Sequence, residues 1–336
     1  MNQPKETPPE ALNPGRIKSQ LAERRERLRT VLQEERRTPQ LIALLKEVDS
    51  ALERVEGGTY GMCEVCDDSI EDRYLRVEPL VRICLEHLSA EQKRSVERDL
   101  QLASQVQAKF LPMHDTNLEG WEIAYRYHPV GPVSGDYCDF VKPENGNGDA
   151  FFFLGDISGK GVAASLLMSQ LHAMFRTLLS TELTLKNLVE RANRLFCEST
   201  RYTDFATLVC GRLSRIGEIE ICNAGHNSPL FVERGEIRSI ESTGLPLGLF
   251  FNAEYTTRKL QLSGGDRLFL YTDGLTESRN PAGDEYSEAR ISSFVAREHH
   301  RGTEELATLS LQDHARFLSS APRLDDLTIM ILHRVL

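Results

Sequence analysis

The chain has 336 residues, of which 40% are hydrophobic and 27% are charged, and its formal net charge is −10. This length fits one large domain or two unequal ones, and the composition excludes a wholly disordered chain, a collagen-like fibre and a bundle of membrane helices. The acidic balance disfavours direct nucleic-acid binding, which needs a basic surface. The first residues are polar and Pro-rich without an apolar stretch, so we expect no secretory signal and a cytoplasmic protein.

The N-terminal part of the chain is predicted to contain a tail and a helical hairpin. Residues 1–15 are polar and rich in proline, which is typical of disorder. Apolar residues then recur at helical spacing from Ile17 to Leu32 and again from Leu41 to Val55, and two glycines follow the second run. We therefore predict a helical hairpin over residues 16–58 and a separate small module over residues 59–88.

Two pairs of metal-ligand residues lie in this small module. Cys63 and Cys66 form the first pair, and Cys84 and His87 form the second, with 17 residues between the pairs. This spacing is typical of a tetrahedral zinc site, and so short a segment needs the metal to supply its folding free energy. We predict one structural Zn²⁺ on these four residues. A redox switch, in which oxidation of Cys63 and Cys66 ejects the zinc, is the alternative.

The module resembles the DksA/TraR-type zinc finger. The resemblance rests on Gly58-Thr-Tyr-Gly-Met-Cys63-Glu-Val-Cys66 and on Pro79-Leu-Val-Arg-Ile-Cys84, which follow the helical hairpin. His87 stands where that family has its last cysteine, and the family's acidic hairpin tip is replaced by Gln33-Glu-Glu-Arg-Arg-Thr-Pro39. The resemblance therefore implies the fold and the zinc, while RNA polymerase binding is kept only as an alternative.

A linker helix is predicted over residues 89–112. Ser89–Gln92 reads as a capping box, and Leu111-Pro112 ends the helix. Apolar residues recur between these points at spacings of 4, 3, 3 and 4, which is typical of a coiled-coil seam. The seam residues are Val96, Leu100, Ala103, Val106 and Phe110. We expect a homodimer through this helix.

From Trp121 onward, short β-rich runs alternate with helical stretches, which predicts an α+β layered domain over residues 113–336. The predicted strands are Glu122–Tyr127, Ala150–Leu154, Phe205–Leu213, Glu218–Cys222, Pro229–Val232, Arg267–Tyr271 and Leu327–His333. The predicted helices are Val162–Leu179, Leu185–Thr200, Ser287–Glu298 and Thr303–Leu318. The first of these helices is apolar nearly all round and is therefore expected to be buried.

Acidic residues stand beside several of these runs. Asp136 precedes the strand at 150–154 and Asp156 follows it, Asp273 follows the strand at 267–271, and Asp325 precedes the last strand. Carboxylates at strand ends converge in space, and together they suit two hard divalent cations that activate a water molecule for attack on phosphorus. A fifth acidic motif is Gly283-Asp284-Glu285, and any one such motif alone is more simply ordinary turn chemistry. Four in order beside core strands favour a metal site.

The domain resembles the PPM family of metal-dependent protein serine/threonine phosphatases, in its bacterial SpoIIE/RsbU-like branch, over roughly residues 100–336. The motifs that carry this resemblance are Ser134-Gly-Asp136-Tyr, Gly155-Asp156-Ile-Ser-Gly-Lys-Gly161, Asn223-Ala-Gly-His-Asn227, Tyr271-Thr-Asp273-Gly-Leu-Thr-Glu277 and Asp325-Asp326-Leu-Thr328. It implies an αββα sandwich with two Mn²⁺ or Mg²⁺ ions between the sheets. The family's ligands fall on Asp156 as the bridging carboxylate, the Ile157 carbonyl, Asp136 on one metal, and Asp273 and Asp325 on the other.

Four further residues are candidates for supporting the ligands or meeting the substrate: Asp139, Lys160, His226 and Asp326. For His226 a structural or substrate-side role is favoured over proton donation. Eukaryotic relatives place a histidine just after the bridging aspartate as a general acid. Ile157-Ser158 occupy that place here, so the general acid is unassigned.

The resemblance implies a phosphatase that acts on phosphoserine or phosphothreonine of a bacterial regulatory protein, with a phosphorylated STAS-domain anti-anti-sigma factor as the expected substrate. The zinc module is then a sensor or dimerisation device, and the linker helix couples it to catalysis. The alternative is a non-enzymatic RNA polymerase-binding regulator with a degenerate phosphatase scaffold. Mn²⁺ and Mg²⁺ accept the same ligands, so the sequence does not choose between them.

Overall fold

The computed structural model describes most of the chain. The described residues are 18, 21–22, 24–26, 28–29, 39–70, 75, 79–84, 87, 90–112, 118–143, 148–181, 183–201 and 203–335, without the side chains of 39–40 and 90–93. The predicted tail at 1–15, most of the hairpin tip, Ile17, Leu32 and the capping-box side chains lie outside them. The chain divides into two units, Met1–Arg98 and Asp99–Leu336. No helix in the described ranges is long and apolar enough to cross a membrane.

The first unit contains two small hydrophobic clusters. Helix α2 (Pro39–Glu56) buries Val48, Ala51 and Leu52 against Leu21, and the described residues between 18 and 29 are helical. The second cluster gathers Ile70, Leu75 and Val81 around Cys63 and Cys84. Among the described residues, each cluster holds only a few buried side chains. Helix α4 (Ala90–Gln107) follows and contains the boundary between the units.

The second unit is a sandwich of two antiparallel sheets. The strand order is β1-β10-β9-β6-β7 in one sheet and β2-β3-β4-β5-β8 in the other. The first sheet comprises β1 (Trp121–His128), β10 (Leu327–Arg334), β9 (Arg267–Tyr271), β6 (Leu230–Glu233) and β7 (Glu236–Ser239). The second comprises β2 (Tyr137–Val141), β3 (Ala150–Ile157), β4 (Ala206–Leu213), β5 (Glu218–Ala224) and β8 (Arg258–Gln261).

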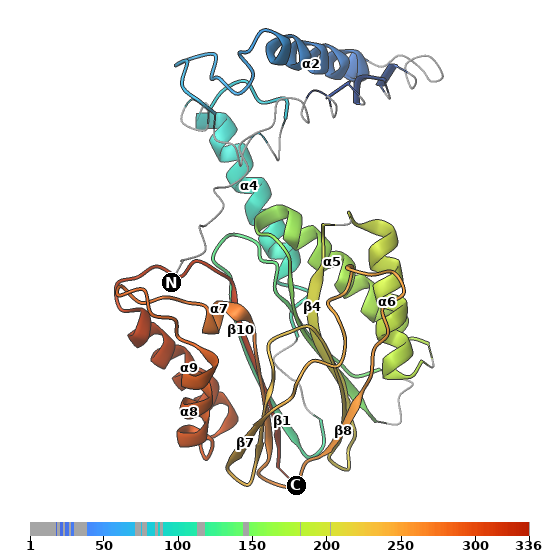
Figure 1. Cartoon of the computed structure of the whole chain (residues 1–336), viewed down its shortest axis with the longest axis vertical. Coiled ribbons are helices and arrows are strands. Elements are labelled where there is room, and N and C mark those ends of the chain that lie inside the picture. Colours follow the sequence, from blue (N-terminus) through green and yellow to red (C-terminus); the bar gives the residue numbers. More distant parts are fainter. Residues whose placement is uncertain are drawn as a thin grey trace, which may run out of the picture. The chain divides into compact units, whose positions relative to one another are not determined.

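Two pairs of helices cover the outer faces of the sheets (Figure 1). Helices α5 (Gly161–Leu178) and α6 (Leu185–Ser199) pack on the sheet that contains β3, and α8 (Glu288–Glu298) and α9 (Thr303–Leu318) pack on the other. Three hydrophobic layers result, one between the sheets and one beneath each helix pair. The αββα sandwich is therefore confirmed. Its central strands are buried on both faces, which explains their nearly continuous apolar sequences.

Three strands and one burial prediction differ from what the sequence indicated. Strands β7 and β8 lie at sheet edges and are mostly exposed, so their sequences lack an apolar alternation. Strand β2 was missed because it carries a buried aspartate, Asp139. Helix α5 is not buried all round: Val162 and Leu166 are 45% and 65% exposed, because only one face of the helix meets the sheet.

Candidate active site

The fold brings the four predicted carboxylates to one end of the sandwich. Asp136 stands just before β2 and Asp156 lies near the end of β3, and these strands pair Tyr137 with Gly155. Asp273 begins helix α7 (Asp273–Thr276) directly after β9, and Asp325 comes shortly before β10. Strands β9 and β10 are also antiparallel neighbours. Each sheet thus supplies two of the carboxylates.

The carboxylate of Asp136 connects the two sheets. It is buried, and its Oδ2 accepts hydrogen bonds from the hydroxyls of Thr272 at 3.0 Å and Thr328 at 2.5 Å. The backbone N–H of Thr328 in turn donates to the Thr272 hydroxyl at 2.9 Å. Sequence reasoning assigned these threonines no role. Their only signal is that each lies within a motif: Thr272 directly precedes the predicted ligand Asp273, and Thr328 comes three positions after Asp325.

Two glycines permit the close approach of the ligand-bearing segments. A Cβ at Gly135 would lie 3.3 Å from the Ile157 carbonyl oxygen and 3.5 Å from Asp156 Oδ1. A Cβ at Gly274 would lie only 1.9 Å from the Asp326 carbonyl oxygen, so the turn after β9 contacts the turn before β10 directly. Any larger residue would push the expected ligands apart.

The carboxylates repel one another strongly. Burial, followed by the charges of Asp273, Asp325 and Asp326, raises the pKa of Asp156 to about 8. Burial and the neighbouring Asp325 raise the pKa of Asp273 to about 6. Burial and the charge of Asp156 also raise the pKa of Asp136 well above its ordinary value. Concentrated oxygen donors whose mutual repulsion a cation relieves fit hard divalent metals such as Mn²⁺ and Mg²⁺.

Asp326 and Lys160 support this centre in different ways. Asp326 accepts backbone N–H groups of Val130 at 2.7 Å and Gly135 at 3.0 Å, so it fixes the loop that leads into Asp136. The Lys160 ammonium lies 2.7 Å from Asp325 Oδ2. Lys160 thus contacts an expected ligand, and Asp326 contacts the loop that carries another.

Asp139 points away from this centre, whereas His226 lies beside it, because the Thr207 hydroxyl that contacts His226 also donates to the Asp156 carbonyl at 3.4 Å. Asp139 is buried and faces α5, where Arg176 donates two hydrogen bonds to its carboxylate at 2.7 and 2.8 Å. Asp139 therefore forms an ion pair beneath the helix instead of supporting the expected metal ligands. His226 is buried with its Nδ1 2.8 Å from the Thr207 hydroxyl. Burial lowers its pKa to about 4, so the imidazole carries no transferable cationic proton at neutral pH.

Gln107 is a supporting residue that the sequence did not reveal. Its amide donates to the Ser134 carbonyl at 2.7 Å and accepts the Ser134 N–H at 2.9 Å, and the side chain is buried. Nearby, Phe110 stacks on His172 of α5 with ring centroids 4.6 Å apart. The C-terminal end of α4 is thus fastened both to the loop before Asp136 and to α5. A lone glutamine on a helix gives no sequence signal for this.

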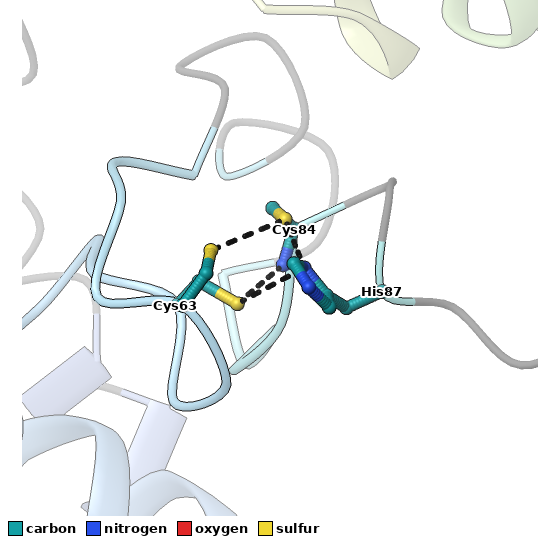
Figure 2. Close-up of side chains that lie close together, drawn as sticks. Cys63, Cys84 and His87 are labelled. Atoms are coloured by element: carbon teal, nitrogen blue, oxygen red, sulfur yellow. Dashed lines mark hydrogen bonds between the residues drawn. The ribbon is translucent and has the colours of Figure 1, made fainter.

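The first unit holds a second group of potential metal ligands. One ligand atom from each of Cys63, Cys66, Cys84 and His87 lies within 4.8 Å of the others. Figure 2 shows Cys63, Cys84 and His87 pointing toward one another, with Cys84 Sγ 3.0 Å from His87 Nδ1. The Cys84 N–H donates to Cys63 Sγ at 3.3 Å. Although burial opposes it, backbone N–H donation lowers the pKa of Cys63 to about 6, which favours the thiolate that zinc requires.

Comparisons with known proteins point to one family. The family model described as Stage II sporulation protein E (SpoIIE) matches residues 146–335. Protein IcfG of Synechocystis sp. is 25% identical over 278 residues, which is 74% of this chain but 43% of IcfG, so the chain spans less than half of that relative. Phosphoserine phosphatase RsbU of Bacillus subtilis is 24% identical over 72% of each protein. The SiaA-PP2C domain of Pseudomonas aeruginosa superposes with a TM-score of 0.63 at 18% identity, covering 73% of this chain and 99% of that domain.

Proposed function

Because this chain belongs to the SpoIIE family, we propose that it is a metal-dependent phosphatase that hydrolyses phosphoserine or phosphothreonine on a bacterial regulatory protein, with a phosphorylated STAS-domain protein as its substrate. The observation that carries the proposal is the convergence of Asp136, Asp156, Asp273 and Asp325 from both sheets at one end of the sandwich. The similarity to RsbU, which is named a phosphoserine phosphatase, supports it. The intact carboxylate set disfavours a degenerate scaffold.

The residues of the centre would hold two Mn²⁺ or Mg²⁺ ions through the four carboxylates and the Ile157 carbonyl. Such ions activate water as a nucleophile and offset the negative charge of the phosphoryl oxygens. Side chains of this chain hold the expected ligands in position. Thr272 and Thr328 donate hydrogen bonds to the Asp136 carboxylate, and Asp326 accepts hydrogen bonds from the loop before Asp136. Ligands held in this way need little rearrangement when a cation binds.

Two measurements test this function. The full chain should hydrolyse p-nitrophenyl phosphate with Mn²⁺ or Mg²⁺ present and lose this activity when the metal is withdrawn. It should also release phosphate from a serine-phosphorylated STAS-domain protein encoded in the same genome. Absence of both Mn²⁺ binding and turnover would contradict the phosphatase and favour the scaffold. Turnover of the small ester without release from the STAS protein would contradict the substrate alone.

For the first unit we propose one structural Zn²⁺ on Cys63, Cys66, Cys84 and His87, and a regulatory role transmitted along α4. The supporting contact is the reciprocal pair of hydrogen bonds between Gln107 and Ser134, because α4 joins the two units in sequence. The exposed seam residues Val96 and Val106 leave an apolar face available for a second copy of the chain. RNA polymerase binding remains the less favoured alternative.

Replacing Gln107 with Leu is expected to lower turnover while the fold persists. The substitution keeps the size of the side chain but leaves the Ser134 N–H and carbonyl without partners, which costs about 1–3 kcal/mol and loosens the loop before Asp136. We expect kcat for p-nitrophenyl phosphate to fall about tenfold or more. Gln105→Leu, on the exposed side of the same helix, is the matched control and should retain wild-type turnover. Equal activity of both variants would refute the coupling.

The stability of the chain without Mn²⁺ or Mg²⁺ is expected to depend on pH through Asp156. Its folded pKa of about 8 exceeds the unfolded value of about 3.9, so ionisation between these values destabilises the fold as pH rises. Asn at this position does not ionise, so the melting temperature of Asp156→Asn should exceed that of the wild type by a margin that grows from pH 5 to pH 8. Differential scanning calorimetry measures this margin. Added Mn²⁺ should make the wild type the more stable of the two proteins. A difference in melting temperature that does not change with pH would contradict the raised pKa of Asp156.

A further inference from the structure

Lys160 provides a positive charge inside the acidic centre. Its ammonium lies 2.7 Å from Asp325 Oδ2 and 2.9 Å from the Leu324 carbonyl oxygen, although Asp325 is far away in sequence. Among the described residues, Lys160 is the one basic side chain that forms an ion pair with any of the four expected ligands, Asp136, Asp156, Asp273 and Asp325. The contact therefore brings the turn after β3 and the turn before β10 together at the metal-ligand end of the sandwich.

The position of this lysine suits a mobile role. Its side chain is 63% exposed, and it occupies the N-cap position of α5 without capping the helix through its side chain. A lysine ammonium is a compact charge on a flexible four-carbon stem and binds both carboxylate and phosphate oxygens. An exposed ion pair of this kind contributes little to stability. The pair with Asp325 is therefore easily exchanged for another anion.

Building on the proposed function, we propose that Lys160 is an exchangeable counter-cation. Its ammonium neutralises Asp325 while the centre holds no metal, and it turns to the phosphoryl oxygens of the substrate once a metal ion occupies Asp325. The lysine thus competes with the metal for one ligand and cooperates with it in holding phosphate. A lysine that only stabilised the start of α5 would neither compete with the metal nor bind phosphate.

The first test is the Mn²⁺ affinity of the full chain, measured by calorimetry for the wild type and Lys160→Met. Removing the competing ammonium should tighten Mn²⁺ binding by about three- to tenfold, the effect of one nearby partly screened charge. Lys186→Met is the matched control, because Lys186 pairs with Glu190 on α6 and its loss changes the net charge equally. This control should bind Mn²⁺ as the wild type does.

The second test uses inorganic phosphate as the probe on the Mn²⁺-loaded chain. Its dissociation constant should rise at least about threefold in Lys160→Met and stay near the wild-type value in Lys160→Arg, which keeps the charge. Tighter metal binding together with weaker phosphate binding supports the inference. Unchanged or weaker Mn²⁺ binding in Lys160→Met, or unchanged phosphate binding, would overturn it. A wild-type chain that binds no Mn²⁺ would instead refute the proposed function itself.

Discussion

Asp156→Asn is expected to lose at least about a thousandfold of the Mn²⁺-dependent hydrolysis of p-nitrophenyl phosphate, because the expected activation of water depends on metal ions that this carboxylate would hold. Burial, followed by the charges of Asp273 and Asp325, raises the pKa of Asp156, and burial together with the charge of Asp156 raises the pKa of Asp136. Asp156 therefore interacts with expected ligands of both metals. Asn preserves the size of the side chain but removes the charge.

The matched control for this variant is Asp284→Asn. Asp284 also lies in a Gly-Asp motif, but it stands in an exposed turn, where it accepts a hydrogen bond from the Asn280 side chain at 3.1 Å. We expect it to keep wild-type turnover. Calorimetry with Mn²⁺ on both variants distinguishes lost metal from lost folding. If Asp156→Asn binds Mn²⁺ and turns over the ester as the wild type does, then the centre is not where the chemistry occurs.

The contrast between Asp156 and Asp284 shows what the sequence could predict about the site. Asp136, Asp156, Asp273 and Asp325 each adjoin a strand of the central layers, and antiparallel pairing brings such strand ends together. Their spacing along the chain therefore predicted a common location. Asp284 follows no core strand, and its motif is only turn chemistry.

Other parts of the site depend on tertiary contacts that leave no periodic trace. Thr272 and Thr328 meet Asp136 only because the two sheets face each other, and Gln107 meets Ser134 only because α4 ends beside that loop. Asp139 was predicted to support the ligands because it is close to Asp136 in sequence. Asp139 lies within strand β2, however, where successive side chains point to opposite faces, and its side chain points toward Arg176 of α5. Strand ends are thus predictable from local sequence, whereas contacts between layers are not.

Replacing Cys84 with Ser is expected to unfold the first unit while the sandwich stays folded. Cys84 is central to the cluster, because its N–H bonds Cys63 Sγ and its own Sγ lies 3.0 Å from His87 Nδ1 and 4.0 Å from Cys66 Sγ. The hydrophobic clusters that the described residues of this unit form are small, so the binding free energy of a structural zinc ion, about 10–16 kcal/mol in zinc-finger peptides, would exceed what these clusters supply.

Three measurements check this expectation on the full chain: the zinc content, amide hydrogen exchange of each unit, and hydrolysis of p-nitrophenyl phosphate. Cys84→Ser should lose about one equivalent of zinc and the exchange protection of residues 39–70, while the amides of β3 and β9 stay protected. Cys197→Ser, a partly buried cysteine of α6, is the control and should keep both.

The same assay separates a structural zinc from a redox switch, because both readings place the metal on these thiolates but differ in what oxidation does. Mild peroxide that releases the zinc and exposes the amides of 39–70, reversibly with a thiol reductant, would favour the switch. Zinc retained at peroxide levels that spare the catalytic unit would favour a purely structural ion, because a fully coordinated thiolate reacts slowly. Full protection of the first unit in Cys84→Ser would contradict both, since the small clusters would then suffice without a metal.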